Sequence, residues 1–342
     1  MTKRISLLLA AVVVMTGLIG CGQKEIPETT LPTQAETKVV SVKEETTVDG
    51  IELLIDTQVN IPDMENLEQI TLTFDDQMLE TMEKELVHSQ YPGLKPEIQN
   101  GDREWQVAND EQLLFSFGCT EESFETGRVH YLDVLRNLNG QDMGNDALMR
   151  WTPNYMTDHV PDGLDMTAEE AGEEIALFLE RYSCFDYVPW NVIAVNCQNV
   201  PDSSGYYQAM LQPEYADLPV YIDGVPYVSA CLSEEGVFTF QGMMVLKEQN
   251  RTPAESYLTL EEAVTLFKSD FSGTVITNTR SVTVNAIKVG YVADAGWQGI
   301  WTLSPAWVFE YSSTYDRQDG QGGGTDYYTC AYRMKDGYFW NN

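Results

Sequence analysis

The sequence contains an internal repeat, and no other feature constrains the fold of this chain as strongly. Thr167-Ala-Glu-Glu-Ala171 recurs as Thr259-Leu-Glu-Glu-Ala263 at an offset of 92 residues (259 − 167 = 92). The same offset relates Leu211-Gln-Pro-Glu-Tyr215 to Leu303-Ser-Pro-Ala-Trp307. In both Thr segments a Glu follows the Thr after three residues, which is the pattern of a capping box at the start of a helix. Separated matches at one offset predict two copies of one structural unit.

Each copy is predicted to form one helix followed by about four antiparallel strands. The segments after the helices are rich in β-branched and aromatic residues. A turn with Gly, Glu235-Gly236 in the first copy and Asp336-Gly337 in the second, precedes a last aromatic strand. A helix that covers one face of a meander sheet is an α+β architecture. We therefore expect two such units, at residues 166–250 and 251–342.

Residues 49–165 are expected to form a further α+β module before the repeats. Asp75 is a predicted N-cap for a helix over residues 76–87, which carries apolar residues at helical spacing. Residues 118–165 are rich in Gly, Asp and Asn and have weak periodicity, so they are predicted to form a loop-rich insertion with short strands. The strands expected in this module lie at 51–61, 69–74, 104–107 and 113–117.

The N-terminus has the pattern of an export signal. Lys3 and Arg4 precede fifteen uncharged residues, 5–19, which is shorter than the roughly 20 that a spanning helix needs. The segment Leu18-Ile19-Gly20-Cys21 resembles the lipobox of bacterial lipoproteins in every position. The resemblance implies diacylglyceryl transfer to the Cys21 thiol, cleavage between Gly20 and Cys21, and loss of the signal peptide 1–20. The alternatives are an uncleaved anchor and an ordinary signal followed by a chance Cys.

The segment after Cys21 has the composition of a disordered tether. Residues 22–48 contain six Thr, five Glu, three Lys and two Pro, without an aromatic residue. Such a segment cannot bury enough apolar surface to offset the entropy of ordering it. We therefore expect an acylated Cys21 and a tether over residues 21–48, with the folded part held at the extracytoplasmic face of the cell membrane.

The repeats also resemble a known family. The helix, the Leu303–Trp307 strand and the last strand with Asp336-Gly337 are similar to PepSY-type domains and to Yyc-type accessory proteins, which regulate a cell-wall sensor kinase. With the lipobox and the Thr-rich tether, the chain resembles uncharacterised lipoproteins of Gram-positive, clostridia-like bacteria. The resemblance implies tandem PepSY-like units and covers about half of the chain.

Charge excludes one class of function. The chain has 20 Lys and Arg against 53 Asp and Glu, a formal net charge of −33. Loss of Lys3 and Arg4 with the signal makes it −35 (−33 − 2). Such a surface repels phosphate backbones, so nucleic-acid binding is excluded. It also repels anionic lipid headgroups, so contact with the bilayer depends on the acylated Cys21.

The sequence contains no catalytic or metal-binding motif. Five Cys remain after Cys21, an odd number, so at least one is unpaired or pairs with another molecule; a Cys184–Cys197 bridge and small buried thiols both stay open. His88, His130 and His159 belong to no metal-ligand pattern. Residues 316–326 form an Asp- and Gly-rich loop that does not follow EF-hand spacing. The five cysteines are Cys119, Cys184, Cys197, Cys231 and Cys330. We expect no enzyme activity, cofactor or metal.

Aromatic residues gather in the second repeat and indicate a candidate binding surface. Trp301, Trp307 and Tyr311 share one face of a strand by period two. Core packing and an exposed groove for a peptide or glycan are the two interpretations.

Two functions remain from the sequence. The first is a non-catalytic binding or regulatory module for a membrane protein or peptide, which a free sheet edge or a flat apolar patch would favour. The second is a lipoprotein that captures a glycan or other small solute, which an aromatic-lined cleft would favour.

Overall fold

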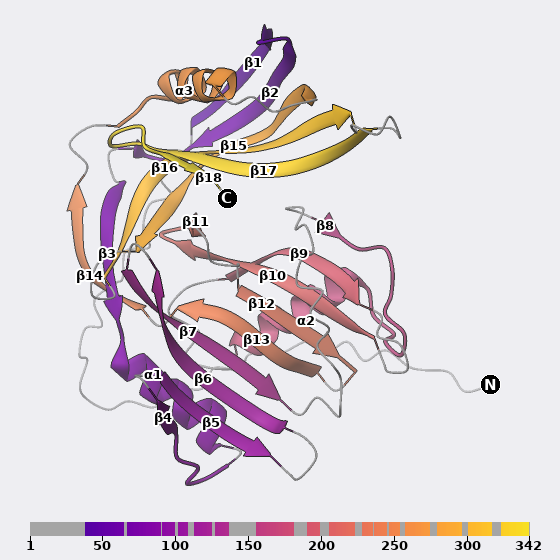
Figure 1. Ribbon diagram of the computed structural model, residues 1–342, viewed down its shortest axis with the longest axis vertical. Helices are drawn as coiled ribbons and strands as arrows, with labels where there is room; N and C mark the ends of the chain where they lie inside the picture. The colour runs from indigo at the N-terminus through magenta and orange to yellow at the C-terminus, as the bar shows by residue number, and fades with distance from the viewer. Residues whose placement is uncertain are drawn as a thin grey trace, which may run out of the picture. The chain divides into compact units, whose positions relative to one another are not determined.

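Strands dominate the fold, as Figure 1 shows. The computed structural model describes residues 38–64, 67–89, 91–99, 102–108, 113–124, 127–136, 155–180, 190–198, 205–222, 228–234, 236–244, 246–253, 257–273, 279–295, 300–316 and 323–341. These residues form 18 strands, which belong to one hydrogen-bonded network, and three α-helices. The fold is mostly β with a large mixed sheet, so the expected α+β class with PepSY-like helix-plus-sheet units is wrong.

Long strands and pairings between distant segments account for this difference. β15 (Thr279–Ala295) alone contains 17 residues. β7 (Gly127–Arg136) pairs with β13 (Gly236–Met244), and β11 (Leu218–Ile222) pairs in parallel with β15. These pairings cross both borders expected between the modules, and Glu36–Asn342 form one compact unit. Pairing partners far apart in sequence cannot be identified from local periodicity, whereas helix starts can.

Nine strands form what we call the first sheet. Their order is β4–β5–β6–β7–β13–β12–β10–β9–β8, and every neighbouring pair is antiparallel except β8–β9. The strands not yet delimited are β4 (Glu97–Gln99), β5 (Asp102–Ala108), β6 (Leu113–Phe124), β8 (Tyr155–Met156), β9 (Trp190–Gln198), β10 (Tyr206–Tyr215) and β12 (Val228–Ser233).

The other nine strands form the second sheet. Its centre is the antiparallel series β15–β16–β17–β18, and the β1–β2 hairpin joins it through a parallel β2–β15 pair. β11 pairs in parallel with the far end of β15, while β3 pairs with the start of β16 and with β14. The strands not yet delimited are β1 (Lys38–Val48), β2 (Ile51–Ile61), β3 (Glu68–Phe74), β14 (Leu246–Pro253), β16 (Trp301–Asp316), β17 (Gly323–Arg333) and β18 (Phe339–Asn341).

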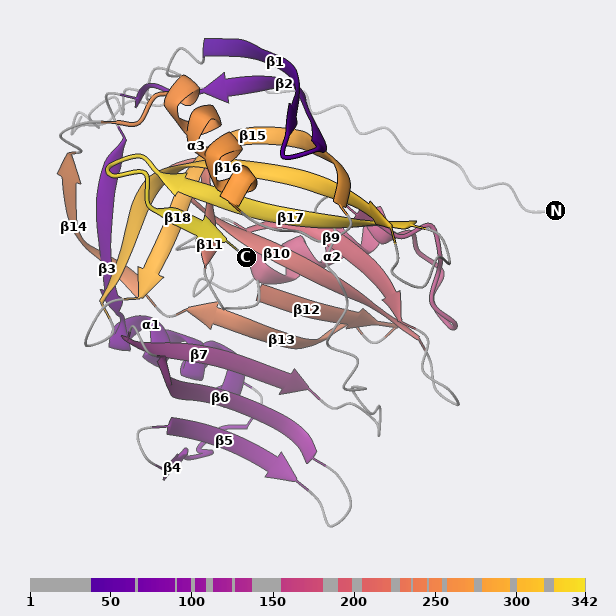
Figure 2. The same cartoon turned by 45° about the horizontal axis from the view of Figure 1, so that its top comes forward.

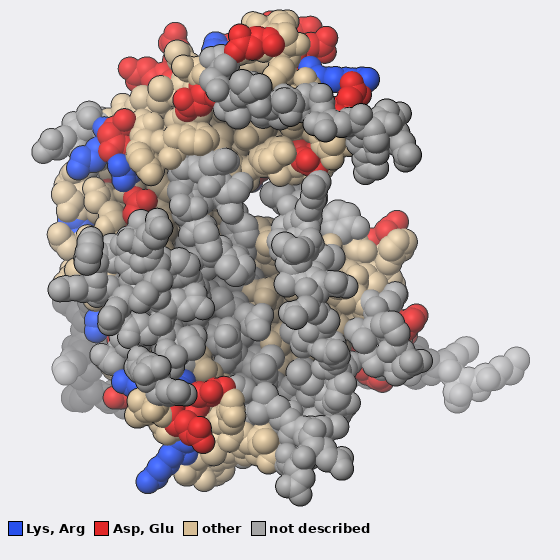
Figure 3. Space-filling view, in the orientation of Figure 1, with Lys and Arg blue, Asp and Glu red and all other residues tan. Residues whose placement is uncertain are grey.

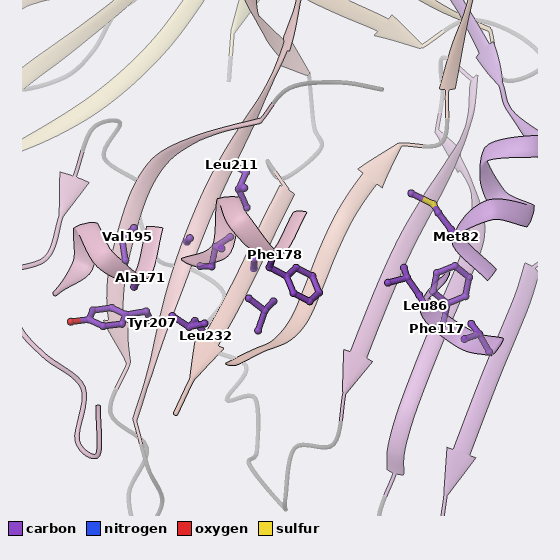
Figure 4. Packing of buried hydrophobic residues seen from close by; sticks show 14 of the residues in the cluster. Met82, Leu86, Phe117, Ala171, Phe178, Val195, Tyr207, Leu211 and Leu232 are labelled. Carbon is purple, nitrogen blue, oxygen red and sulfur yellow. The ribbon is translucent and has the colours of Figure 1, made fainter. Parts of the chain in front are cut away.

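Helices cover one face of each sheet. α1 (Asp76–Met82), its π-helical continuation η2 (Glu83–His88) and α2 (Ala168–Glu180) share one buried cluster with strands of the first sheet. α3 (Leu260–Gly273) lies over the second sheet (Figure 2), where Phe267 stacks on Phe309 at 4.7 Å between ring centroids. Figure 4 shows part of the first cluster, in which the labelled residues are Met82, Leu86, Phe117, Ala171, Phe178, Val195, Tyr207, Leu211 and Leu232.

The two predicted capping boxes are confirmed. At α2, Glu170 N donates to Thr167 Oγ1 at 3.2 Å, and Thr167 N donates to Glu170 Oε2 at 2.7 Å. At α3 the equivalent distances, with Thr259 and Glu262, are 3.2 and 2.8 Å. Residues matched by the repeat lie in like elements. Those pairs are Ala171 with Ala263, buried in α2 and α3, and Pro213 with Pro305, buried in β10 and β16.

The last part of the expected tether is a strand, so the boundary of the tether at residue 48 is wrong. β1 pairs antiparallel with β2 over 11 residue pairs, from Lys38↔Ile61 to Val48↔Ile51. The turn between them is Asp49-Gly50, with φ of 50° and 86°, and such positive angles suit the two-residue hairpin. Val42 and Val48 pack against the core beneath α3. Composition alone does not reveal that a polar segment gains a pairing partner directly after it in sequence.

The N-terminal elements are confirmed in part. The strands expected at 51–61 and 69–74 are β2 and β3, and the Asp75 carboxylate accepts a hydrogen bond from Gln77 N at the start of α1. The expected loop-rich insertion over 118–165 is wrong in its first part. β6 continues to Phe124, and β7 adds ten residues. β13 supplies the pairing that orders β7, and this partner lies about a hundred residues further on.

Candidate interaction site on the edge of β17

The structure buries the two tryptophans of the predicted aromatic surface. Trp301 is 2% exposed and Trp307 is 1% exposed, so their assignment to a binding surface is wrong. Trp307 lies under α3, where its Nε1 donates to Leu258 O at 2.7 Å. Trp301 packs instead in a cluster around β3, β11, β15 and β16. The alternation of side chains along the strand placed these residues on one face, but the sequence did not show that helices and strands cover that face.

Tyr311 lies at the border of this buried region. Its ring contacts Phe267 of α3 at 5.4 Å and stacks on Tyr328 of β17 at 5.3 Å between centroids. Burial raises the pKa of the Tyr311 hydroxyl, so this group stays neutral over the physiological range. Tyr311 therefore connects the buried aromatic residues beneath α3 with Tyr328 on β17.

Exposed aromatic side chains lie on β17, on β18 and directly before β18, next to the predicted ones. Tyr327 is 50% exposed and Tyr338 is 59% exposed, and Tyr328 and Phe339 are exposed as well. Tyr338 lies beneath the Arg333 guanidinium, 4.9 Å from the ring centroid. This surface was not predicted from the sequence. The adjacent pair Tyr327-Tyr328 could have indicated it, because neighbouring strand residues point to opposite faces and a strand at the edge of a sheet rarely buries both faces.

β17 also has an unpaired edge over most of its length. It pairs with β16 from Gly323 to Arg333, but β18 covers only Cys330 to Tyr332 on the other side. Figure 2 shows β18 alongside one end of β17. In the described chain no strand pairs with Gly323–Thr329 on the side away from β16. We call this seven-residue segment the β17 edge, and its outward main-chain groups can pair with another strand.

The β17 edge lacks the protection that other edges of the second sheet have. Native proteins protect edge strands with charged side chains and Pro. The edge strand β1 carries Lys38, Lys43, Glu44 and Glu45, and the edge strand β14 carries Lys247, Glu248, Arg251 and Pro253. The β17 edge, Gly-Gly-Thr-Asp-Tyr-Tyr-Thr, contains only one charged residue, Asp326, and no Pro. Of these three edges, the β17 edge is the best suited to accept a further strand.

The two faces beside the β17 edge differ. Tyr328 lies on the face covered by α3, because it stacks on Tyr311 and is followed at Cys330 and Tyr332 by residues buried under that helix. Asp326 lies on the same face by alternation, and its carboxylate accepts a hydrogen bond from the Tyr328 hydroxyl at 3.4 Å. Tyr327 lies on the opposite face, across from Ser312 of β16.

The described residues do not assemble a metal site. They contain no group of three His, Cys, Asp or Glu side chains placed to hold a metal ion. His88 Nε2 lies 2.9 Å from Glu83 Oε1, which also accepts from Trp105 Nε1, while His159 is exposed beside Asp158. The side chain of His130 lies outside the description.

The cysteines in the described part of the chain form no disulfide, and two of them are buried. Cys197, Cys231 and Cys330 are free cysteines. Burial raises the pKa of Cys231 to about 12 and also raises the pKa of Cys330, so both thiols stay protonated near neutral pH. Because Cys197 is free, the structure contains no Cys184–Cys197 bridge. Cys184 itself, the side chain of Cys119, most of loop 316–326, and Gly20 and Cys21 are not among the described residues.

A groove of about 620 Å³ lies at the start of α3. Two of its three acidic side chains, those of Glu262 and Asp336, are already engaged. Glu262 accepts hydrogen bonds from Thr259, and Asp336 forms a two-point ion pair with Arg333 at 2.6 and 2.8 Å. Aromatic rings do not contribute to the lining, which consists of Leu258, Thr259, Glu261, Glu262, Thr265, Leu266, Asp336 and Gly337. The groove therefore lacks the aromatic walls that the solute-capture alternative requires.

Within the described residues, no helix has the length and apolar character needed to cross a bilayer.

Comparison with known proteins gives a structural likeness alone. No family model matches the chain, and no curated protein matches it. Among solved structures, the chain is similar to the crystal structure, at 1.45 Å resolution, of an uncharacterized protein from Eubacterium rectale ATCC 33656. The TM-score is 0.57 at 13% sequence identity, over 87% of this chain and 93% of that one. At this identity the likeness shows a shared fold, which extends over nearly the whole of both chains.

Proposed function

We propose that this protein is a lipid-anchored, extracytoplasmic binding protein that captures an extended segment of a membrane protein or peptide by strand addition. The observation that carries the proposal is the β17 edge, which in the described chain has no strand partner on the side away from β16, contains a single charged residue, Asp326, and is flanked by exposed tyrosines. Main-chain hydrogen bonds would supply affinity, and the tyrosines on the two faces would select side chains of the segment. The proposed role is non-catalytic binding.

Membrane attachment belongs to the same proposal. The lipobox Leu18-Ile19-Gly20-Cys21 supports acylation of Cys21. Because the compact unit begins at Glu36, the tether would comprise 14 residues (35 − 21 = 14) rather than 27. A coil of 14 residues spans roughly 20 Å. The folded unit would thus be held close to the bilayer, where segments of membrane proteins emerge.

A peptide selection followed by mapping of protected amides tests strand addition. The mature chain, residues 21–342 with Cys21→Ser to prevent acylation, is used to select displayed random peptides. We expect the enriched peptides to slow hydrogen exchange of the amides in Gly323–Thr329, because new main-chain hydrogen bonds protect them. Peptides that protect another element, or no element, would contradict the proposal.

A matched pair of variants provides the control. Thr325 is exposed on the β17 edge, and Thr46 is exposed on the edge strand β1. Thr325→Lys should weaken binding of the selected peptides about tenfold or more, since a charge on an edge opposes strand addition. Thr46→Lys should leave their binding unchanged.

A further inference from the structure

The arrangement around the β17 edge constrains the chemistry of its partner. A second copy of this chain is a poor partner. In an antiparallel, twofold pairing of two Gly323–Thr329 segments, the central residue Asp326 would face Asp326 of the other copy. Like charges directly opposite each other destabilise a strand pair. The net charge of −33 on each chain adds long-range repulsion.

Carboxylates flank the β17 edge on the face that α3 covers. Asp326 lies on this face beside Tyr328. Asp270, near the end of α3, is within electrostatic reach of the same face, where it raises the pKa of Cys330 beyond the effect of burial. Figure 3 shows acidic side chains over the part of the molecule where α3, β1 and β2 lie.

The Lys and Arg side chains of α3 and β15 form ion pairs with carboxylates other than Asp326 and Asp270. Lys268, the basic residue of α3, donates to Glu44 at 2.8 Å. The basic residues of β15 are Arg280 and Lys288, which donate to Asp316 and Glu310, each at 2.6 Å. β16 carries no Lys or Arg. Among the described residues, the α3 face beside the β17 edge thus combines the carboxylates of Asp326 and Asp270 with stacked tyrosine rings, on a chain whose net charge is −33.

We infer that the segment captured at the β17 edge is cationic and carries Lys or Arg at alternate positions. This inference rests on the proposed strand addition. Side chains of an added strand alternate between the faces, so residues two apart would lie opposite Asp326 and Tyr328. The first position favours an ion pair, and the second a cation above the Tyr328 ring. The residues between them would lie beside Tyr327 on the opposite face.

Two synthetic peptides test the inference on the mature chain with Cys21→Ser. One is a seven-residue peptide of alternating Thr and Lys, and the other has Gln in place of Lys. We expect the Lys peptide to bind about threefold to tenfold more tightly at low salt, as exposed ion pairs allow, and most of this preference to disappear at about 0.5 M salt. Both peptides should protect the amides of Gly323–Thr329 from exchange.

Two variants assign the preference to this edge. Asp326→Asn should reduce the ratio of the two affinities, whereas Glu45→Gln, which removes an exposed carboxylate from the edge strand β1, should leave it unchanged. Equal affinities with protection of Gly323–Thr329 would overturn the cationic preference and leave strand addition standing. A Lys preference that Asp326→Asn does not alter would overturn the assignment to this edge. Absence of protection by both peptides would overturn strand addition and the inference together.

Discussion

Substitution of Gly290 tests the contact that joins β11 to β15. β11 pairs in parallel with β15 at Val220↔Tyr291, directly after this glycine. A Cβ on Gly290 would lie 2.8 Å from Pro219 O and 3.0 Å from Tyr221 Cε2. Both distances are below van der Waals contact, and one of the two atoms belongs to the main chain. Gly290→Ala therefore requires the backbone of β11 to move away from β15.

The expected cost follows from two opposing effects. Overpacking of a close contact costs about 1–3 kcal/mol, whereas replacing Gly by Ala reduces the entropy of the unfolded chain and stabilises the fold by about 0.4–1 kcal/mol. We expect Gly290→Ala to lower the free energy of unfolding by about 1–2 kcal/mol. Gly118, on β6, is the matched control, because its Cβ would meet no heavy atom within 4 Å. Gly118→Ala should stabilise the protein slightly.

Urea unfolding followed by circular dichroism measures both variants on the mature chain. The Gly290→Ala midpoint should fall and the Gly118→Ala midpoint should stay or rise. Hydrogen exchange adds a local readout, because the amides of Leu218–Ile222 should exchange faster only in Gly290→Ala. A Gly290→Ala protein as stable as the wild type would refute the close approach of β11 to β15.

Three further predictions concern the N-terminus and one ion pair. Deleting residues 36–48 should lower the urea midpoint, because it removes β1 and its core valines, whereas deleting 22–35 should not; equal midpoints would show that β1 contributes no stability. Cys21→Ala should prevent lipid labelling and release the protein or leave it unprocessed, and lipid labelling that persists would exclude Cys21 as the acylation site. Hydrogen bonds from Arg251, then Tyr215, lower the pKa of Glu248. At pH values above the ordinary Glu pKa, Glu248→Gln should therefore lower the free energy of unfolding by up to about 1 kcal/mol. The difference between the variant and the wild type should vanish as the pH falls through the lowered pKa, and urea midpoints at several pH values measure it.

Local signals in the sequence predicted local structure well. The Thr-x-x-Glu boxes of α2 and α3 form the expected hydrogen bonds, and Asp75 caps α1. The strand expected at 51–61 is β2, in which one side is largely buried and the other exposed. Each of these signals depends on interactions between residues that are close in sequence, so it does not require knowledge of the tertiary fold.

Features that depend on distant partners could not be predicted. β7 pairs on one side with its neighbour β6 but on the other with the distant β13, and β11 pairs with β15. The exposure of the aromatic residues depends on which strands and helices cover them, so Trp301 and Trp307 are buried while Tyr327 is not. The β17 edge is itself defined by where β18 ends. No periodicity in the sequence of β17 indicates that its neighbour spans only three residues.

Photocrosslinking in intact cells tests the central claim most directly. A photoreactive residue replaces Thr325 on the β17 edge in one strain and Thr46 on β1 in another, in the full acylated chain. We expect the probe at position 325 to capture a partner, with crosslinks that map to one extended, Lys- or Arg-containing segment. A second copy of the protein without the photoreactive residue should compete for this partner and reduce the crosslinks. The same competitor with Thr325→Lys should not reduce them. Capture from position 46 alone, or crosslinks from 325 scattered over a partner surface rather than along one segment, would contradict strand addition at the β17 edge.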